Sequence, residues 1–199
     1  QLRAGVNALE RPNPAGVHWP LSEAPVAFMP VEGWEEREGS SFVNYEEASA
    51  LQTLLDQVLA ACDVPASQIG IITLYAAQAR LLRRNLCLNR NNIDTRTGAM
   101  GVEVSSVDGF QGREKELIIV STVRANSGRG VGFLSDPRRL NVCLTRARRG
   151  LVVFGHWTTL SQDTEVWGPW LGWAQSAGLV AGYPADDPAA ATALAGVSP

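Results

Sequence analysis

Apolar residues recur along this chain in two patterns that alternate with each other. Short runs rich in aliphatic residues predict strands, and stretches with apolar residues three and four positions apart predict helices. The predicted strands are 26–29, 69–73, 102–106, 117–121 and 151–154. The predicted helices are 45–62, about 76–88, one opening at 136–137, and about 164–177. This alternation predicts an α/β fold, a parallel sheet flanked by helices on both faces.

Residues that favour helix ends support these boundaries. Asn44 is a good N-cap for the helix over 45–62, and two glutamates follow it in the first turn, where the helix dipole favours acidic side chains. Asp136 and Pro137 are suited to the N-cap and first position of a later helix. Gly178 is expected to end the last helix, because glycine tolerates the left-handed backbone found there.

The domain organisation follows from composition along the chain. Residues 1–24 are rich in proline and form a lead-in segment that we expect to continue from a preceding domain, since the chain begins without Met or a signal-peptide pattern. Residues 25–182 are expected to form the folded domain, and 183–199, dominated by Ala and Pro, a disordered tail. Connections without apolar periodicity are expected at 32–41, 89–101 and 127–132.

The chain has 199 residues, enough for one domain, and 45% of them are hydrophobic. No apolar run is long enough to span a membrane. The three cysteines, Cys62, Cys87 and Cys143, are odd in number and widely spaced, which favours buried thiols in a reducing compartment over disulfides or a zinc site. With only His18 and His156 present, the sequence argues against a histidine metal site or a Ser-His triad.

Arginine accounts for almost all of the positive charge. Lys115 is the only lysine among 17 basic residues, while a net charge of -3 argues against a generic nucleic-acid binder. Five arginines nevertheless fall within 138–149, RRLNVCLTRARR. If this stretch is helical, Arg139 and Arg146 share one flank beside an apolar face made of Leu140, Cys143, Leu144 and Ala147. The two arginines then form a phosphate clamp, or the run is simply a solvated helix face.

A second polar segment, SVDGFQGRE at 106–114, connects two predicted strands. Ligands bind at the carboxyl ends of strands in parallel α/β sheets, so this segment is a candidate site. The alternative is an ordinary tight turn, because Gly109 and Gly112 are common turn residues.

Three stretches resemble motifs of superfamily-1 RNA helicases of the up-frameshift family, which act in nonsense-mediated decay. SSVDGFQGREKELIIVSTVRAN and GFLSDPRRLNVCLTRARRG resemble motifs V and VI, and IITLYAAQ resembles motif IV. The resemblance covers the chain from about residue 2 to about 180. Departures from the family pattern are Leu74 for proline, Ala76 for an acidic residue and Gly109 for alanine.

The resemblance implies the second RecA-like domain of a two-domain motor, with ATP in the cleft between the domains. Arg146 is then the arginine finger that reaches the γ-phosphate. The residues expected to bind the nucleotide are Gln111, Gly112, Arg113, Glu114 and Arg139. The other domain is expected to hold Mg²⁺ and most of the ATP, because Lys115 does not follow a glycine-rich P-loop turn.

Single-stranded nucleic acid is expected to cross both domains. The residues implied for this contact are Thr73, Tyr75, Ser106 and Asp108, and a core role for Tyr75 remains an equal alternative. Arg124 and Asn126 also match the family string and are expected to bond the glycine-rich loop.

The leading functional hypothesis is the C-terminal motor domain of an ATP-dependent 5′-to-3′ RNA helicase. The expected partners are single-stranded RNA, with DNA possible, and the first RecA-like domain, and the expected location is the cytoplasm, with the nucleus as an alternative. The chain alone is expected to be inactive. The competing hypotheses are a DNA-directed helicase domain of the same superfamily and a non-catalytic binding module that kept the fold.

Overall fold

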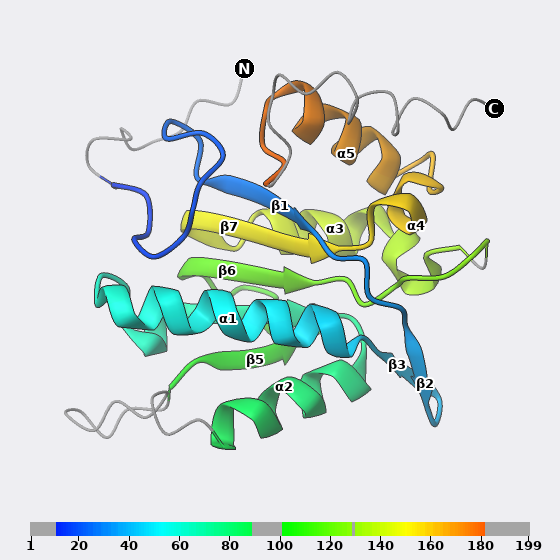
Figure 1. Ribbon diagram of the computed structural model, residues 1–199, viewed down its shortest axis with the longest axis horizontal. Coiled ribbons are helices and arrows are strands. Elements are labelled where there is room, and N and C mark those ends of the chain that lie inside the picture. Colours follow the sequence, from blue (N-terminus) through cyan, green and yellow to red (C-terminus); the bar gives the residue numbers. More distant parts are fainter. Residues whose placement is uncertain (1–10, 89–100, 129, 182–199) are drawn as a thin grey trace.

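A five-stranded parallel sheet forms the centre of the molecule (Figure 1). The computed structural model describes residues 11–88, 101–128 and 130–181. The strand order is β1-β7-β6-β4-β5, with β1 Val26–Pro30, β7 Ala147–Gly155, β6 Lys115–Ser121, β4 Ile69–Thr73 and β5 Glu103–Ser106. Every neighbouring pair in this sheet is parallel. The predicted fold class, a parallel sheet flanked by helices in a RecA-like arrangement, is therefore confirmed.

Helices cover both faces of the sheet (Figure 1). The helices α1 Tyr45–Ala61 and α2 Ala76–Leu88 pack on one face. The helices α3 Pro137–Leu144, α4 Trp157–Ser161 and α5 Trp167–Ser176 contribute side chains to the core on the other face. Strand β6 shows why the sequences of the central strands contain continuous apolar runs. Leu117 and Ile119 enter the α1–α2 core, whereas Ile118 and Val120 enter the opposite core.

The structure confirms most of the predicted helix ends. The Asn44 side chain accepts a hydrogen bond of 2.9 Å from the backbone N–H of Glu47, as expected of an N-cap. Gly178 has a φ of +69° just beyond the C-cap of α5. The prediction of buried thiols is wrong for Cys62, which is exposed and is the C-cap of α1 in a left-handed backbone conformation. It is confirmed for Cys143, which is buried. The Cys87 side chain lies outside the described residues.

Several short elements were not predicted. The expected connection at 32–41 contains most of a two-stranded hairpin, β2 Glu36–Glu38 and β3 Ser41–Val43. Helix α4 and three 3-10 turns, η2 Ala66–Gln68, η4 Asp108–Phe110 and η5 Gly132–Ser135, are too short for a periodic pattern to reveal. Helix α5 begins at Trp167, three residues later than expected.

The arginine run is not one helix, and this corrects the prediction. Helix α3 ends at Leu144, where the backbone N–H of Thr145 bonds to the carbonyl oxygens of Asn141 and Val142. Strand β7 already begins at Ala147, because its start pairs with Lys115 of β6. Arg139 and Arg146 therefore do not share a helix flank. Of the other three arginines of the run, Arg138 lies on α3, and Arg148 and Arg149 belong to β7.

The described part of the lead-in packs against the amino end of β7. The Trp19 indole donates a hydrogen bond of 2.9 Å to the Pro14 carbonyl oxygen. Both side chains lie so close to Gly150 that a Cβ there would approach them to 2.8 and 2.9 Å. In addition, Arg149 bonds to the Pro12 carbonyl oxygen at 2.8 Å. Residues 1–10 and 182–199, with the expected tail, lie outside the described residues. In the described part of the chain, no helix is both long and apolar enough to cross a bilayer.

Candidate functional site

The residues proposed from sequence lie at two opposite edges of the sheet. Glu114 and Arg146 immediately precede β6 and β7, so both lie at the edge formed by the amino ends of the strands. Thr73 and Ser106 are the last residues of β4 and β5, at the carboxyl edge. Because every strand of the five-stranded sheet runs in the same direction, the structure places Glu114 and Arg146 at the opposite edge from Thr73 and Ser106.

Arg146 sits in the turn between α3 and β7. Its carbonyl oxygen accepts a hydrogen bond of 3.1 Å from the backbone N–H of Lys115, which ties the turn to the start of β6. Its guanidinium donates through Nη2 to the Thr145 hydroxyl at 2.9 Å. The Nε atom is buried and has no hydrogen-bond partner among the described residues. A buried donor without a partner is costly, so this arginine is arranged to gain from an incoming anion.

The turn before β6 presents its polar side chains to solvent. Gln111, Gly112, Arg113 and Glu114 are all exposed. Gly112 has a φ of +77°, a conformation that glycine adopts without strain. The turn is anchored by Phe110, which is fully buried and occupies the space that a side chain on Gly70 would need, since a Cβ there would lie 2.7 Å from the Phe110 ring.

Two of these exposed residues are already paired with neighbours. Glu114 bonds to Arg148 at 3.1 Å, with both side chains about half exposed. Arg113 forms an ion pair with Glu103, which also pairs with Lys115 at 3.0 Å. Burial alone raises the pKa of Glu103, but bonds from Lys115 and Arg113 outweigh it and leave that pKa lowered. Lys115 also donates to the Ser67 carbonyl oxygen at 2.7 Å, so the only lysine has a structural role.

A small cleft of about 140 Å³ opens at the carboxyl edge. It is lined by Leu74, Ser106, Val107, Asp108, Phe133 and Arg139. Two predicted nucleic-acid residues, Ser106 and Asp108, therefore lie together, and Asp108 is 72% exposed. Arg139 was expected among the nucleotide residues, but its nearest carboxylates are Asp108 at 3.7 Å and Asp136 at 4.0 Å. The structure places Arg139 with the expected nucleic-acid residues because α3 begins at the carboxyl edge.

The other two predicted nucleic-acid residues are buried. Thr73 is fully buried and Tyr75 is only 4% exposed, so neither presents its side chain at the surface. The Tyr75 hydroxyl donates to the Val131 carbonyl oxygen at 3.4 Å and accepts from Arg124 at 3.3 Å. Burial raises the pKa of Tyr75 above its ordinary value. For Tyr75, the structure therefore favours the core role that the sequence left open.

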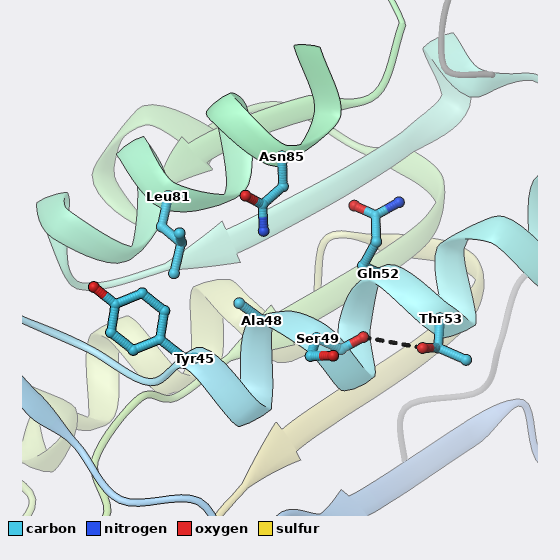
Figure 2. Close-up of a pocket in the computed structure, with 7 residues that line it drawn as sticks. All are labelled: Tyr45, Ala48, Ser49, Gln52, Thr53, Leu81 and Asn85. Carbon is cyan, nitrogen blue, oxygen red and sulfur yellow. Dashed lines mark hydrogen bonds between the residues drawn. The ribbon is translucent and has the colours of Figure 1, made fainter. Parts of the chain in front are cut away.

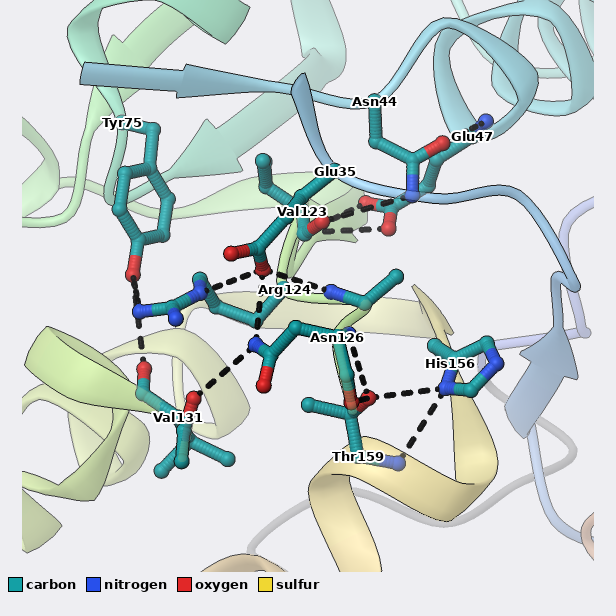
Figure 3. A network of polar contacts seen from close by, with 12 residues as sticks. Glu35, Asn44, Glu47, Tyr75, Val123, Arg124, Asn126, Val131, His156 and Thr159 are labelled. Atoms are coloured by element: carbon teal, nitrogen blue, oxygen red, sulfur yellow. Dashed lines mark hydrogen bonds and ion pairs between the residues drawn. The ribbon is translucent and has the colours of Figure 1, made fainter. Parts of the chain in front are cut away.

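A buried polar network supports this edge (Figure 3). Arg124 and Glu35 form an ion pair of 2.7 Å in which both side chains are at most 7% exposed. The same Glu35 oxygen accepts from the Asn126 side chain at 2.9 Å, and that amide also donates to the Gly130 carbonyl oxygen at 3.2 Å. The expectation that Asn126 bonds the glycine-rich loop is confirmed. Glu35 was missed, since a lone acid in a polar stretch carries no local signal of burial.

Glu47 is a second buried acid that the sequence did not single out. It is fully buried at the start of α1, and both carboxyl oxygens lie near the backbone N–H of Val123. Burial raises the pKa of Glu47 to about 8, against the lowering effect of bonds from Ser121, Val123 and Thr122. Val123 has a φ of +72°, which is strained for a β-branched residue. The Glu47 contact holds this strained residue directly before Arg124.

A separate concavity of about 530 Å³ lies between α1 and α2 (Figure 2). It is lined by Tyr45, Ala48, Ser49, Gln52, Thr53, Leu81 and Asn85. None of these is a residue proposed from the sequence, and none carries a formal charge near neutral pH. This concavity therefore does not offer the charged groups that phosphate chemistry requires.

Known proteins share this sequence over most of its length. A family model described as "AAA domain" matches residues 1–158. The chain is 40% identical over 166 residues to "Regulator of nonsense transcripts 1" of Dictyostelium discoideum, covering 82% of this chain and 12% of that protein. It is also 40% identical over 166 residues to "ATP-dependent helicase NAM7" of Saccharomyces cerevisiae, covering 82% and 17%. "Uncharacterized ATP-dependent helicase MJ0104" of Methanocaldococcus jannaschii is 41% identical over 158 residues, covering 78% and 21%. The chain thus spans between an eighth and about a fifth of the length of these relatives.

Proposed function

Because this chain belongs to the AAA domain family and to its up-frameshift group of superfamily-1 helicases, we propose that it is the C-terminal motor domain of an ATP-dependent 5′-to-3′ RNA helicase. Two of the relatives described above are named as ATP-dependent helicases, which supports the use of ATP. In this proposal, the chain contributes one wall of a nucleotide cleft and part of a nucleic-acid track.

Arg146 is the observation that carries the proposal. Its guanidinium lies at the amino edge of the sheet with a buried Nε that lacks a partner among the described residues. A phosphate oxygen would satisfy this donor, and the planar guanidinium is suited to bind phosphate with two parallel hydrogen bonds. Bound ATP would supply the phosphoryl group that is transferred to water. Arg146 would then stabilise the negative charge that develops on that group, the role of an arginine finger.

The exposed turn before β6 would complete this wall of the cleft. Glu114 would accept hydrogen bonds from the ribose hydroxyls after it gives up its exposed partner, Arg148. Gln111 and Arg113 are exposed on the same turn and would surround the rest of the nucleotide. The P-loop and the magnesium ligands would come from another domain, because the only lysine is bonded to Ser67 and Glu103.

The carboxyl edge would serve the nucleic acid. Ser106 and Arg139 line one cleft there and offer a hydroxyl and a guanidinium, which are common partners of phosphate and sugar oxygens. Strands β6 and β7 run between the two edges at the centre of the sheet.

The test is Arg146→Ala in a full-length protein that contains this chain. We expect ATP turnover to fall by roughly a thousandfold or more, with folding and RNA binding largely retained. Arg146→Lys should restore little, since an ammonium group cannot reproduce the planar fork. Steady-state phosphate release with magnesium and single-stranded RNA measures both effects.

The control is Arg138→Ala, in the same arginine run. Arg138 is exposed on α3, and its replacement should change turnover little. Arg149 is unsuitable as a control, because it bonds to Asp63 at 2.7 Å and helps hold the lead-in. Equal and modest losses in the Arg146 and Arg138 variants would indicate a generic basic surface. Unchanged turnover in Arg146→Ala would favour the non-catalytic binding module instead.

A further inference from the structure

Phe133 is the most exposed large hydrophobic residue in the described part of the chain. Its side chain is 64% exposed, and it lies at the mouth of the cleft at the carboxyl edge. Moving an aromatic ring of this size out of water, against another apolar surface, would be favourable. Because this exposed ring lies beside the proposed binding cleft, it is a candidate contact for the ligand of that cleft.

The backbone holds this ring outward. Phe133 lies on the 3-10 turn η5, between Val131, 4% exposed, and Leu134, 1% exposed. The Val131 carbonyl oxygen accepts a bond from the Tyr75 hydroxyl, and the Leu134 carbonyl oxygen accepts one of 2.9 Å from the Trp167 indole. With the residues on both sides bonded to the core, the Phe133 side chain is directed to solvent before any ligand arrives. A ring that is already ordered loses little conformational entropy on binding.

The surroundings of the ring include charged and polar groups beside the apolar Leu74 and Val107. The Arg139 guanidinium lies 5.8 Å from the centre of the Phe133 ring, and the Tyr75 ring centre lies at 6.4 Å. Ser106 and Asp108 line the same cleft. An exposed aromatic ring with a cation over one face, and a hydroxyl and a carboxylate in the same cleft, suits a flat ligand that stacks on the other face and carries both an anion and hydrogen-bond donors.

We propose that Phe133 stacks on one base of single-stranded nucleic acid, an inference that rests on the function proposed above. Every nucleobase has a flat face, so this contact adds affinity without sequence preference. Arg139 and Ser106 then contact the phosphate or sugar beside the stacked base. Asp108 accepts a hydrogen bond from a base amino group or a ribose hydroxyl. Phe133 thus adds a stacking contact with a base to a nucleic-acid track whose other proposed contacts are polar.

Trp34 provides a contrast on the same edge of the sheet. It is 58% exposed, but the concavity beside it is lined by three carboxylates, Glu32, Glu36 and Glu46. These acids repel phosphates, so Trp34 is not expected to touch the strand. Trp34→Ala is therefore a matched control that removes an exposed aromatic ring without removing the proposed stacking contact.

The experiment compares a fluorescein-labelled oligouridine with a fully abasic strand of equal length, using fluorescence anisotropy with this 199-residue chain at low salt. The wild-type chain should bind the oligouridine about 5- to 150-fold more tightly than the abasic strand, which corresponds to the stacking free energy of one base. Phe133→Ala should lose most of this preference and keep its affinity for the abasic strand. Phe133→Trp should retain the preference, and Phe133→Leu should lose it.

Further measurements separate stacking from structural damage. The slope of log affinity against log salt should be the same for wild type and Phe133→Ala, because no phosphate contact is removed. The unfolding temperature should also change little, since the ring is exposed. Trp34→Ala should keep the preference for bases.

The outcomes also separate this inference from the proposed function. If the wild-type chain binds neither strand, the nucleic-acid track and the stacking contact both fail. If it prefers the oligouridine and Phe133→Ala retains that preference in full, only the stacking contact is overturned. Equal losses for both strands, or equal losses in Phe133→Ala and Trp34→Ala, would overturn it as well.

Discussion

The backbone N–H of Val123 lies between the two carboxyl oxygens of Glu47, at 3.1 and 3.0 Å, although 76 residues separate them. This contact joins the first turn of α1 to the end of β6. It stabilises Val123 at a φ of +72°, and Arg124 follows directly with its buried ion pair. The expected nucleic-acid edge is therefore held in place partly by a carboxyl group that is absent from any helicase motif identified in the sequence.

Glu47 should make stability depend on pH. Its pKa is raised from 4.5 to about 8 by burial, so between these values the folded chain keeps a proton that the unfolded chain releases. The free energy of unfolding should consequently fall as pH rises from about 5 to about 8, with a slope of up to about 1.4 kcal/mol per pH unit. Urea denaturation of wild type and Glu47→Gln at half-unit pH intervals measures this slope.

The difference between the two proteins isolates the contribution of Glu47 from those of all other titratable groups. Glu47→Gln should lack this component of the slope. Glu46→Gln is the control, because Glu46 is the exposed neighbour in the same helical turn. Parallel curves for wild type and Glu47→Gln would mean that the carboxyl group is ionised in the folded chain.

Removing Glu35 should destabilise the chain strongly. Glu35→Ala leaves the Arg124 guanidinium buried without its 2.7 Å partner, and such unpaired charges cost about 3 to 5 kcal/mol. Glu38→Ala is the matched control, since Glu38 pairs with Arg80 at 2.9 Å with both side chains more than half exposed. That surface pair should contribute about 0.5 kcal/mol or less. Urea unfolding midpoints compare the two variants, and similar losses would contradict the buried character of the Glu35 pair.

The 199-residue chain should hydrolyse no ATP by itself. Its only lysine is engaged by the Ser67 carbonyl oxygen at 2.7 Å and Glu103 at 3.0 Å, so it cannot serve in a P-loop. Phosphate release from the purified chain with magnesium, ATP and single-stranded RNA provides the measurement. Turnover that is stimulated by RNA and abolished by Arg146→Ala would show that this chain carries a complete catalytic site.

Binding of single-stranded RNA by this chain should be weak and sensitive to salt. With about two to four phosphate contacts, the slope of log affinity against log salt should be on the order of -0.7 per contact. The net charge of -3 limits any further electrostatic attraction. Titrations from low to physiological salt give the slope, and tight binding without salt dependence would argue against a phosphate track.

Periodicity predicted the sheet and its main helices because each strand and helix has its own local pattern. The alternation of Leu117, Ile118, Ile119 and Val120 between the two cores explains why a buried strand was visible from sequence. The arginine run was misjudged because the start of β7 depends on pairing with Lys115, a partner 32 residues away in the chain. The spacing of apolar residues within the run carries no information about the pairing of Ala147 with Lys115.

The candidate site was predictable only in part, for a related reason. Motif residues such as Ser106 and Asp108 lie two positions apart in the sequence and therefore appear together in a pattern. Glu35 meets Arg124 across 89 residues, and nothing in its own surroundings indicates a buried charge. The exposure of Phe133 likewise depends on the tertiary bonds of Val131 and Leu134.

Gly132 has an evolutionary consequence. A Cβ at this position would lie 2.4 Å from the Arg124 guanidinium, and the backbone there has a φ of +59°. Any substitution must therefore displace the arginine or strain the turn. The two positions should therefore constrain each other: a side chain at position 132 becomes easier to accommodate once Arg124 is shortened or moved, although the positive φ still favours glycine. In related sequences that keep Arg124, we therefore expect glycine at the position that corresponds to 132.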